Sequence, residues 1–118
     1  MVDHVKFEVL GSRGFLFEVR FWLTEDGAFR SFCTCESGFQ LVHCVHRMDI
    51  LEGNLSAVTH NVPEGDKKFI VEALAKSESG RLLGEVQAIK TEIAEARKRL
   101  RIAHERFDRE FCRMPFRE

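Results

Sequence analysis

This sequence of 118 residues carries almost no excess charge of either sign, because 18 Lys and Arg face 19 Asp and Glu. A uniformly basic nucleic-acid binder and an acidic solvating tail are therefore both excluded as descriptions of the whole chain. Long apolar runs are also missing: none approaches the ~20 residues that span a bilayer, and the first residues lack the apolar stretch of a signal peptide. We expect a protein of the cytoplasm, or of the nucleus in a eukaryote, that is not secreted and has no membrane partner.

What is present is an ordinary globular composition, with 44% hydrophobic and 31% charged residues. Such a balance disfavours wholesale disorder, and the length predicts one compact domain with an appendage. Phenylalanine is concentrated at the start of the chain, where seven of the 11 Phe residues lie within the first 39 positions.

Apolar and polar residues alternate in this Phe-rich region with a period of two, which is typical of strands with one buried face. In the second predicted strand the buried positions are Phe15, Phe17, Val19 and Phe21. The pattern predicts strands over residues 5–9, 15–21 and 28–33, with turns at residues 11–14 and at Asp26–Gly27. We therefore expect an antiparallel three-stranded meander.

Helical spacing of apolar residues replaces the alternation in the second part of the chain. It predicts a helix over residues 45–51, a loop over 59–65, a short helix capped by Asp66, and a break at 77–80. Further on, apolar residues recur alternately four and three positions apart, at Leu82, Val86, Ile89, Ile93, Ala96, Leu100, Ala103 and Phe107. This is the a/d seam of a coiled coil, on a helix about 45 Å long.

A single helix cannot bury such a stripe alone, so the seam needs a partner. We expect a homodimer through the C-terminal helix, with an interface of Val86, Ile89, Ile93, Leu100 and Phe107. The alternative is that the helix folds back on the shorter helix and the sheet.

Three of the four cysteines lie within 12 residues, beside two histidines. In a reducing compartment such clusters bind metal more often than they form disulfides. The pattern C-x-C-x8-C-x-H supplies four S and N donors of the kind that hold Zn²⁺ in a tetrahedron, from Cys33, Cys35, Cys44 and His46. His43 could replace His46, and Gly38 gives the connecting loop conformational freedom. Cys112 stands alone and is expected to be a free thiol.

This ligand pattern resembles the SWIM zinc finger, whose signature C-x-C-x(n)-C-x-H is matched by the same four residues. The resemblance covers residues 15–53, extends to Phe29 and Phe32, and favours His46 over His43 as the ligand. It implies a β-hairpin and a helix clamped by zinc, in proteins that bind DNA or other proteins. SWIM modules occur beside transposase cores, in chromatin-remodelling ATPases, in recombination-mediator complexes and in ubiquitin ligases.

Elements typical of enzymes are missing from the sequence. It contains no His-Glu-x-x-His, no Gly-rich phosphate loop and no Gly-x-Ser-x-Gly element. Four protein ligands also close the coordination shell of zinc, whereas a catalytic zinc usually keeps one position for water. We therefore expect that the protein is not an enzyme.

Charge is segregated along the chain. Residues 97–118 carry eight Lys and Arg against four acids, and residues 1–96 carry the other ten against 15 acids. The basic stretch can bind DNA or RNA phosphates through Arg97, Lys98, Arg99 and Arg101. The alternative is that it is only a solvated face of the helix. On the predicted sheet, Arg20 and Trp22 share a face that Arg30 can join.

These patterns together predict an α+β protein with three parts. Residues 1–58 form a β-sheet and a SWIM-like zinc finger, residues 59–80 a linker and short helix, and residues 81–118 a long basic helix with the seam. The predicted function is a zinc-binding regulatory protein that binds nucleic acid, most readily DNA, and carries a helical dimerisation element. The alternative is a protein-interaction module or a small inhibitor of a larger enzyme, for instance one encoded by a phage or mobile element, in which zinc is only a structural staple.

Overall fold

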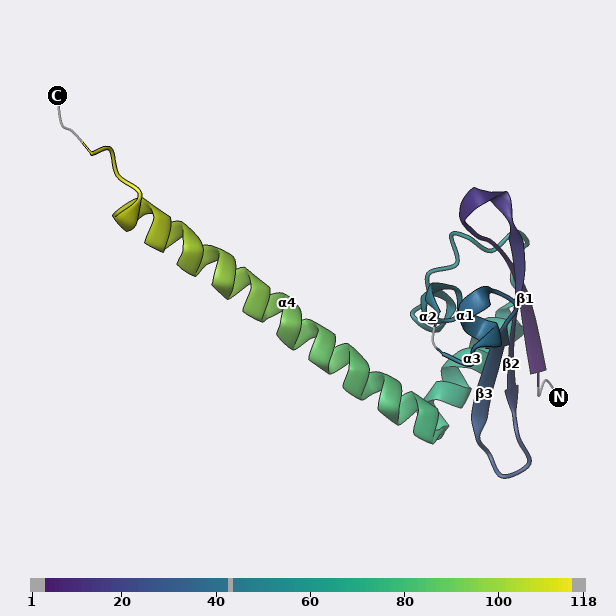
Figure 1. Ribbon diagram of the computed structural model, residues 1–118. Coiled ribbons are helices and arrows are strands. Elements are labelled where there is room, and N and C mark those ends of the chain that lie inside the picture. Colours follow the sequence, from purple (N-terminus) through teal and green to yellow (C-terminus); the bar gives the residue numbers. More distant parts are fainter. Residues whose placement is uncertain (1–3, 43, 116–118) are drawn as a thin grey trace. The chain divides into compact units, whose positions relative to one another are not determined.

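The computed structural model describes residues 4–42 and 44–115 and shows a mixed α+β fold (Figure 1). The fold class expected from the sequence, a small antiparallel meander followed by helices, is confirmed. The chain divides into two compact units, residues 1–82 and 83–118. In chain order the elements are β1 (His4–Leu10), a 3-10 turn η1 (Ser12–Gly14), β2 (Leu16–Leu23), β3 (Phe29–Cys33), α1 (Glu36–Phe39), α2 (Val45–Leu51), α3 (Glu64–Lys76) and α4 (Glu78–Phe111).

The three strands form one antiparallel sheet in the order β1-β2-β3. In the central strand, Phe21 lies opposite Val5 of β1 and opposite Ser31 of β3. The hairpin turn predicted at Asp26–Gly27 is present, closed by a hydrogen bond of 2.8 Å from Thr24 N to Ala28 O. Because side chains alternate between the two faces of a sheet, this pairing places the buried residues of all three strands on one side.

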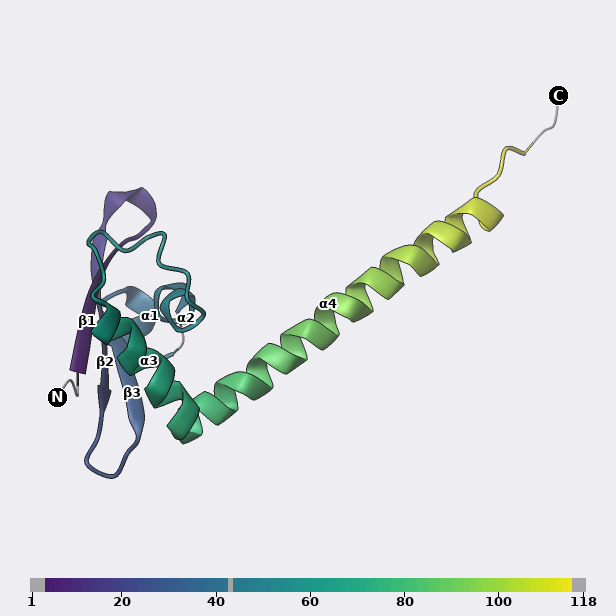
Figure 2. The same cartoon turned by 180° about the vertical axis from the view of Figure 1, so that it is seen from behind.

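The core of the N-terminal unit lies between that inner face and the helices. Helices α1, α2 and α3 all lie on the same side of the sheet (Figures 1 and 2). The rings of Phe21 and Phe29 stack at 5.7 Å, and Phe29 meets Phe69 of α3 edge-on at 6.2 Å. Burying each large apolar side chain contributes about 1.5–3 kcal/mol. The buried set includes Val5, Phe7, Val9, Val19, Phe21, Phe29, Ile50, Phe69, Ile70 and Ala73.

The loop between α2 and α3, residues 52–63, covers the free edge of β1. Leu10 N donates to Ala57 O at 2.8 Å, and Thr59 N donates to Glu8 O at 3.0 Å. His60 Nε2 accepts the backbone N–H of Glu8 at 3.3 Å. Outward-facing backbone groups of the edge strand therefore find partners within the chain.

The prediction for Phe15 is wrong. It was assigned to the buried face of the second strand, but it lies before β2 and is 61% exposed. The cause is the turn η1, in which Arg13 adopts a φ of 66°. A hydrogen bond of 2.7 Å from Gly11 N to Phe15 O closes this turn, so that Phe15 ends the connection instead of entering the strand.

Helix boundaries also differ from those predicted. α3 begins at Glu64, with Pro63 rather than Asp66 at its N-cap position, so the preceding loop is shorter than expected. The φ of −59° at Pro63 already suits a helix start. The predicted break after α3 is confirmed at Ser77, which has an extended ψ of 158°. α4 then begins at Glu78.

Helix α4 contains 34 residues and has no buried residue. Every position from 84 to 111 is exposed, and the helix carries the predicted seam on its surface. The five predicted interface residues are between 43% and 58% exposed: Val86, Ile89, Ile93, Leu100 and Phe107. No helix among the described residues is both long and apolar enough to cross a membrane.

Candidate metal centre

Three sulfur atoms and one imidazole nitrogen converge between the end of β3 and the start of α2. The ligand atoms of Cys33, Cys35, Cys44 and His46 all lie within 4.8 Å of one another. Cys33 Sγ is 3.7 Å from His46 Nδ1. With Zn–S bonds of about 2.3 Å, neighbouring donors of a tetrahedral zinc site are about 3.8 Å apart. The cluster is therefore compatible with zinc binding.

The first cysteine pair is brought together by a bend at the end of β3. Thr34, between the two cysteines, is fixed to β2: its Oγ1 accepts Glu18 N at 2.9 Å, and its own N–H donates to Glu18 O at 3.0 Å. The chain then turns, and Cys35 becomes the N-cap residue of α1. Cys35 Sγ accepts the backbone N–H of Gly38 at 3.4 Å. Both sulfurs consequently face the same side of the chain, as the C-x-C spacing requires.

The second pair lies at the start of α2, as predicted. Cys44 is the N-cap residue of this helix, with extended dihedral angles of −138° and 158°. His46 lies in the first turn, and its ring packs against that of Phe17 at 5.0 Å. Zinc at this site would therefore connect the end of the sheet to the beginning of a helix.

Gly38 has a different role from the predicted one. It lies in α1, a short helix that the sequence analysis had taken as a loop. A Cβ atom on Gly38 would stand 1.8 Å from the backbone oxygen of Cys33 and 3.0 Å from its Cβ. The site needs a glycine here because the helix and the strand end approach each other closely, not because the backbone needs conformational freedom.

Burial and hydrogen bonds act in opposite directions on the thiols. At Cys44 burial disfavours the thiolate, but the backbone N–H and side chain of Arg47 outweigh it and hold the pKa below its usual value. At Cys33 burial dominates and raises the pKa to about 12, although the backbone N–H of Cys35 opposes it. A bound cation removes this penalty, because a metal-coordinating thiol is deprotonated outright.

The fourth cysteine and the alternative histidine ligand remain to be located. Cys112 follows the end of α4 as an exposed free thiol. His43 lies outside the residues that the structure describes.

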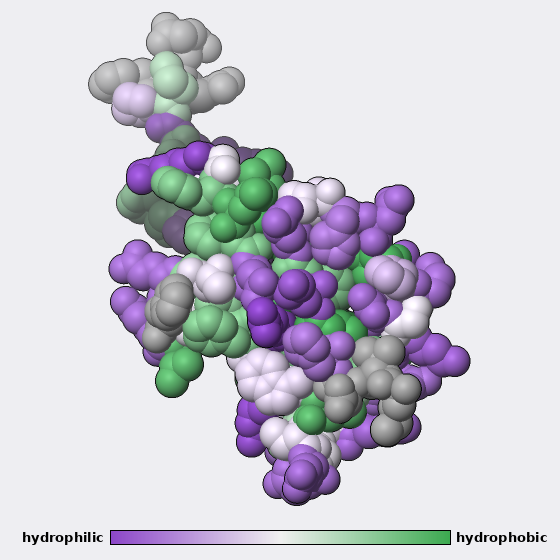
Figure 3. Space-filling view, turned by 90° about the vertical axis from the view of Figure 1, so that its right-hand side faces the viewer, coloured by the Kyte–Doolittle hydropathy of each residue, from purple (hydrophilic) through white to green (hydrophobic). Residues whose placement is uncertain are grey.

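The outer face of the sheet brings together the three residues expected there. Trp22 lies directly opposite Arg30, and Arg20 lies opposite Phe32. Because Arg20 and Trp22 are two positions apart on β2, all four side chains belong to one face. Figure 3, viewed from this side of the sheet, shows hydrophilic residues surrounding paler and apolar ones. Arg20 also forms an ion pair with Glu18.

The basic residues of the C-terminal unit lie on the exposed surface of α4. Successive residues of a helix are about 100° apart, so the four predicted contacts do not form one stripe. Arg97, Lys98 and Arg101 lie on one side of the helix, within an arc of about 100°, while Arg99 faces away from them.

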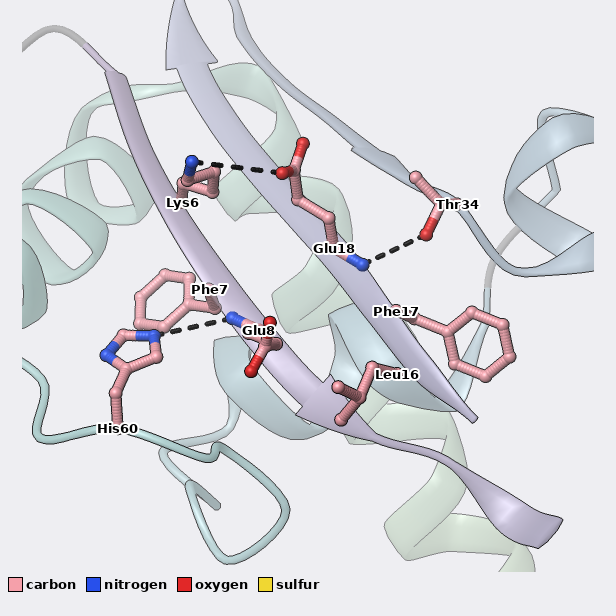
Figure 4. A pocket seen from close by; sticks show the side chains of 8 residues that line it. All are labelled: Lys6, Phe7, Glu8, Leu16, Phe17, Glu18, Thr34 and His60. Atoms are coloured by element: carbon pink, nitrogen blue, oxygen red, sulfur yellow. Dashed lines mark hydrogen bonds and ion pairs between the residues drawn. The ribbon is translucent and has the colours of Figure 1, made fainter. Parts of the chain in front are cut away.

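A pocket of about 340 Å³, which the sequence analysis did not find, lies beside β1 and β2 (Figure 4). Lys6 Nζ lies 3.9 Å from Glu18 Oε1 in its wall. The two nitrogens of His60 are engaged: Nε2 accepts Glu8 N–H, and Nδ1 lies 3.2 Å from the Asn61 carbonyl oxygen. The histidine therefore holds the loop on the strand and is not free to act as a base. The pocket joins residues far apart in sequence, so no local pattern could have indicated it.

No protein-family model matches this chain, and no curated protein and no solved structure matches it. The SWIM resemblance therefore rests on the four ligand residues and on their strand-to-helix setting.

Proposed function

We propose that this chain is a SWIM-like zinc-binding protein that binds nucleic acid and is not an enzyme. The observation that carries the zinc assignment is the convergence of four donor atoms, three sulfurs and one nitrogen, within 4.8 Å. Four protein ligands fill a tetrahedral shell, which is the arrangement of structural zinc sites. Zinc then stabilises the fold, and its coordination shell has no position left for a reactive water.

The role of the metal follows from the positions of its ligands, which lie at the ends of secondary-structure elements. Cys33 ends β3, Cys35 caps α1, and Cys44 caps α2. One ion would thus fix three element ends together. Structural zinc contributes about 10–16 kcal/mol of apparent binding free energy, which becomes folding free energy when the apo site is not preformed.

The nucleic-acid assignment is supported by the outer face of the sheet. Trp22, which is half-buried, lies across from Arg30 and on the same face as Arg20. An aromatic ring can stack on a base of any sequence, at about 1–3 kcal/mol per base, while guanidinium groups bind phosphates. The exposed basic residues 97–101 of α4 provide further phosphate contacts.

A binding experiment tests this proposal. The zinc-loaded full chain is titrated into labelled single- and double-stranded DNA and RNA at several salt concentrations, and fluorescence anisotropy is recorded. We expect binding that weakens as salt rises, because phosphate contacts release counterions. Replacement of four residues by Gln should weaken binding to all sequences alike and flatten the salt dependence: Arg97, Lys98, Arg99 and Arg101.

The matched control removes the same amount of charge from the N-terminal unit away from the proposed contacts, by Gln at Arg13, Lys67, Lys68 and Lys76. We expect this control to bind nearly as the unmutated chain does. Equal losses in both variants would indicate a general Coulombic effect rather than contacts by α4. Absence of binding under all conditions would reject the nucleic-acid function.

The exposed seam of α4 favours a second candidate function, a protein-interaction module. Val86, Ile93 and Leu100 are each more than 40% exposed, although apolar residues at regular spacing are typical of packed helices. In this case the chain would regulate or inhibit a larger enzyme, for instance one encoded by a phage or mobile element, and zinc would only stabilise the body. Binding to a protein but to no nucleic acid would favour this candidate.

A further inference from the structure

The sequence of α4 indicates which kind of partner fits its apolar seam. We propose that α4 pairs with the same helix of a second copy of this chain, as a parallel two-stranded coiled coil. The a positions of the seam are Val86, Ile93, Leu100 and Phe107, and the d positions are Leu82, Ile89, Ala96 and Ala103. This inference concerns the partner of α4 and does not depend on zinc or nucleic-acid binding.

The period of the seam indicates a helical partner. Its eight members alternate four and three residues apart over residues 82–107, so the pattern repeats every seven residues with two members in each repeat, a period of 3.5. A straight helix has 3.6 residues per turn, so a stripe of period 3.5 drifts around it. The stripe faces one partner throughout only if two helices supercoil around each other. Helices that cover a globular core use a wider face and the period of 3.6.

The flanks of the seam are charged in a pattern that complements itself. Glu85 and Glu92 occupy g positions, and Lys90 and Arg97 occupy e positions. In a parallel dimer each g residue meets the e residue five positions later in the second copy. Glu85 therefore meets Lys90, and Glu92 meets Arg97, and symmetry makes each attraction occur twice. A second copy of the chain thus presents charges opposite to those that flank this seam.

The same charges bear on the direction of the pair. An antiparallel pair also gains attractive g-to-g contacts, Glu85 with Arg106 and Glu92 with Arg99, but it adds a repulsive contact that the parallel pair lacks. An antiparallel pair that aligns the apolar layers places Val86 beside Ala103, and Phe107 beside Leu82, of the second copy. In that alignment e residues face e residues, which sets Lys90 against Arg97 on both sides of the dimer. The parallel pair contains no such contact between permanently charged residues of one sign, since Arg99 meets His104.

The core residues include a combination typical of two strands. Val86 and Ile93 at a positions with Leu82 at a d position favour parallel dimers, whereas Ile89 at d and Leu100 at a are more typical of larger bundles. Ala96 and Ala103 occupy the d positions of the second half, where small side chains allow the two helices to approach closely.

The oligomeric state is tested on the zinc-loaded full chain by light scattering coupled to size exclusion at micromolar concentration. We expect twice the mass of one chain for the unmutated protein. Ile93→Asp places a charge in the seam and should halve the mass, whereas the control Ile102→Asp, at the outer c position, should leave the dimer intact. Circular dichroism verifies that both variants remain folded. A monomeric unmutated chain, or equal dissociation by both variants, would overturn the dimer.

The direction is tested by cross-linking in a Cys112→Ser background. In a parallel dimer the two copies of residue 103 face each other, so Ala103→Cys should form an intermolecular disulfide on mild oxidation. Ala94→Cys, at the outer b position, is the matched control and should not. In the antiparallel pair the two copies of residue 103 are far apart. A stable dimer whose Ala103→Cys variant does not cross-link would therefore overturn the parallel arrangement.

Discussion

Gly38 approaches Cys33 so closely that a methyl group on Gly38 would overlap the carbonyl oxygen of Cys33, at 1.8 Å. This contact sets the distance between α1 and the end of β3. Since Cys35 caps α1 and Cys33 ends β3, the same contact also sets the distance between two of the four metal-binding side chains. Backbone packing and metal geometry are thus linked at one position.

Gly38→Ala should therefore weaken both the fold and the metal site. The neighbouring atoms belong to the backbone and cannot move aside cheaply, so we expect a loss of at least about 1–3 kcal/mol. Urea unfolding and zinc content measure the two effects. Gly84→Ala is the control, because no atom lies within 4 Å of its added methyl group. That change should leave zinc content unaltered and favour the helix by about 1 kcal/mol. Normal zinc content in Gly38→Ala would contradict the linkage.

Cys35→Ser and Cys112→Ser should differ sharply. The first removes a donor from the four-atom cluster, whereas the second alters an exposed thiol outside it. We expect elemental analysis to find one zinc per chain in the unmutated protein and in Cys112→Ser, and little in Cys35→Ser. Thermal unfolding of Cys35→Ser should resemble that of the chelator-treated protein. Similar behaviour of the two variants would mean that different cysteines bind the metal.

Arg47→Ala should move zinc release to higher pH. Protons and zinc compete for the same thiolates, so acid releases the metal. Arg47 helps to hold the pKa of Cys44 below its usual value. Its removal raises that pKa, so protons displace zinc at a pH higher than in the unmutated chain. A chromogenic chelator monitors release, and Arg13→Ala, a change on the exposed turn η1, is the control. An unchanged release curve in Arg47→Ala would reject a role for its side chain.

His60→Ala should loosen the loop from the edge of the sheet. Glu8 N–H loses its acceptor, and the ring of Phe7 loses the stacked imidazole at 6.4 Å. We expect a stability loss of about 1 kcal/mol, the usual net value of one hydrogen bond. Faster hydrogen exchange of the Glu8 amide would show the local effect. His104→Ala, on the exposed surface of α4, serves for comparison and should leave that amide protected.

Local sequence patterns predicted the fold well where a single physical requirement determines the structure. Alternating apolar residues in β1 and β2 must face a single core, and the C-x-C and C-x-H spacings place donors on one side of a bend or turn. Phe15 follows the same alternation, yet a hydrogen bond to Gly11 removes it from the strand. A local sequence pattern does not reveal such a competing contact.

Tertiary contacts account for what the sequence could not indicate. Gly38 looks like a flexible loop residue until Cys33 is placed beside it. His60 has no partner at helical or strand spacing, and its role appears only when the loop returns to β1, 52 positions earlier. Pro63 and Asp66 are both reasonable helix starts, and the structure uses the one whose fixed φ already suits the first turn.

The loop over residues 52–63 also affects how the folded chain can aggregate. An open edge strand is a template on which strands of other molecules add, and such additions propagate into fibrils. Here Ala57, Thr59 and His60 already occupy hydrogen-bonding groups of β1. Growth of a fibril from this edge would first require the loop to detach, so loss of this short connection would leave β1 open to the addition of strands from other molecules.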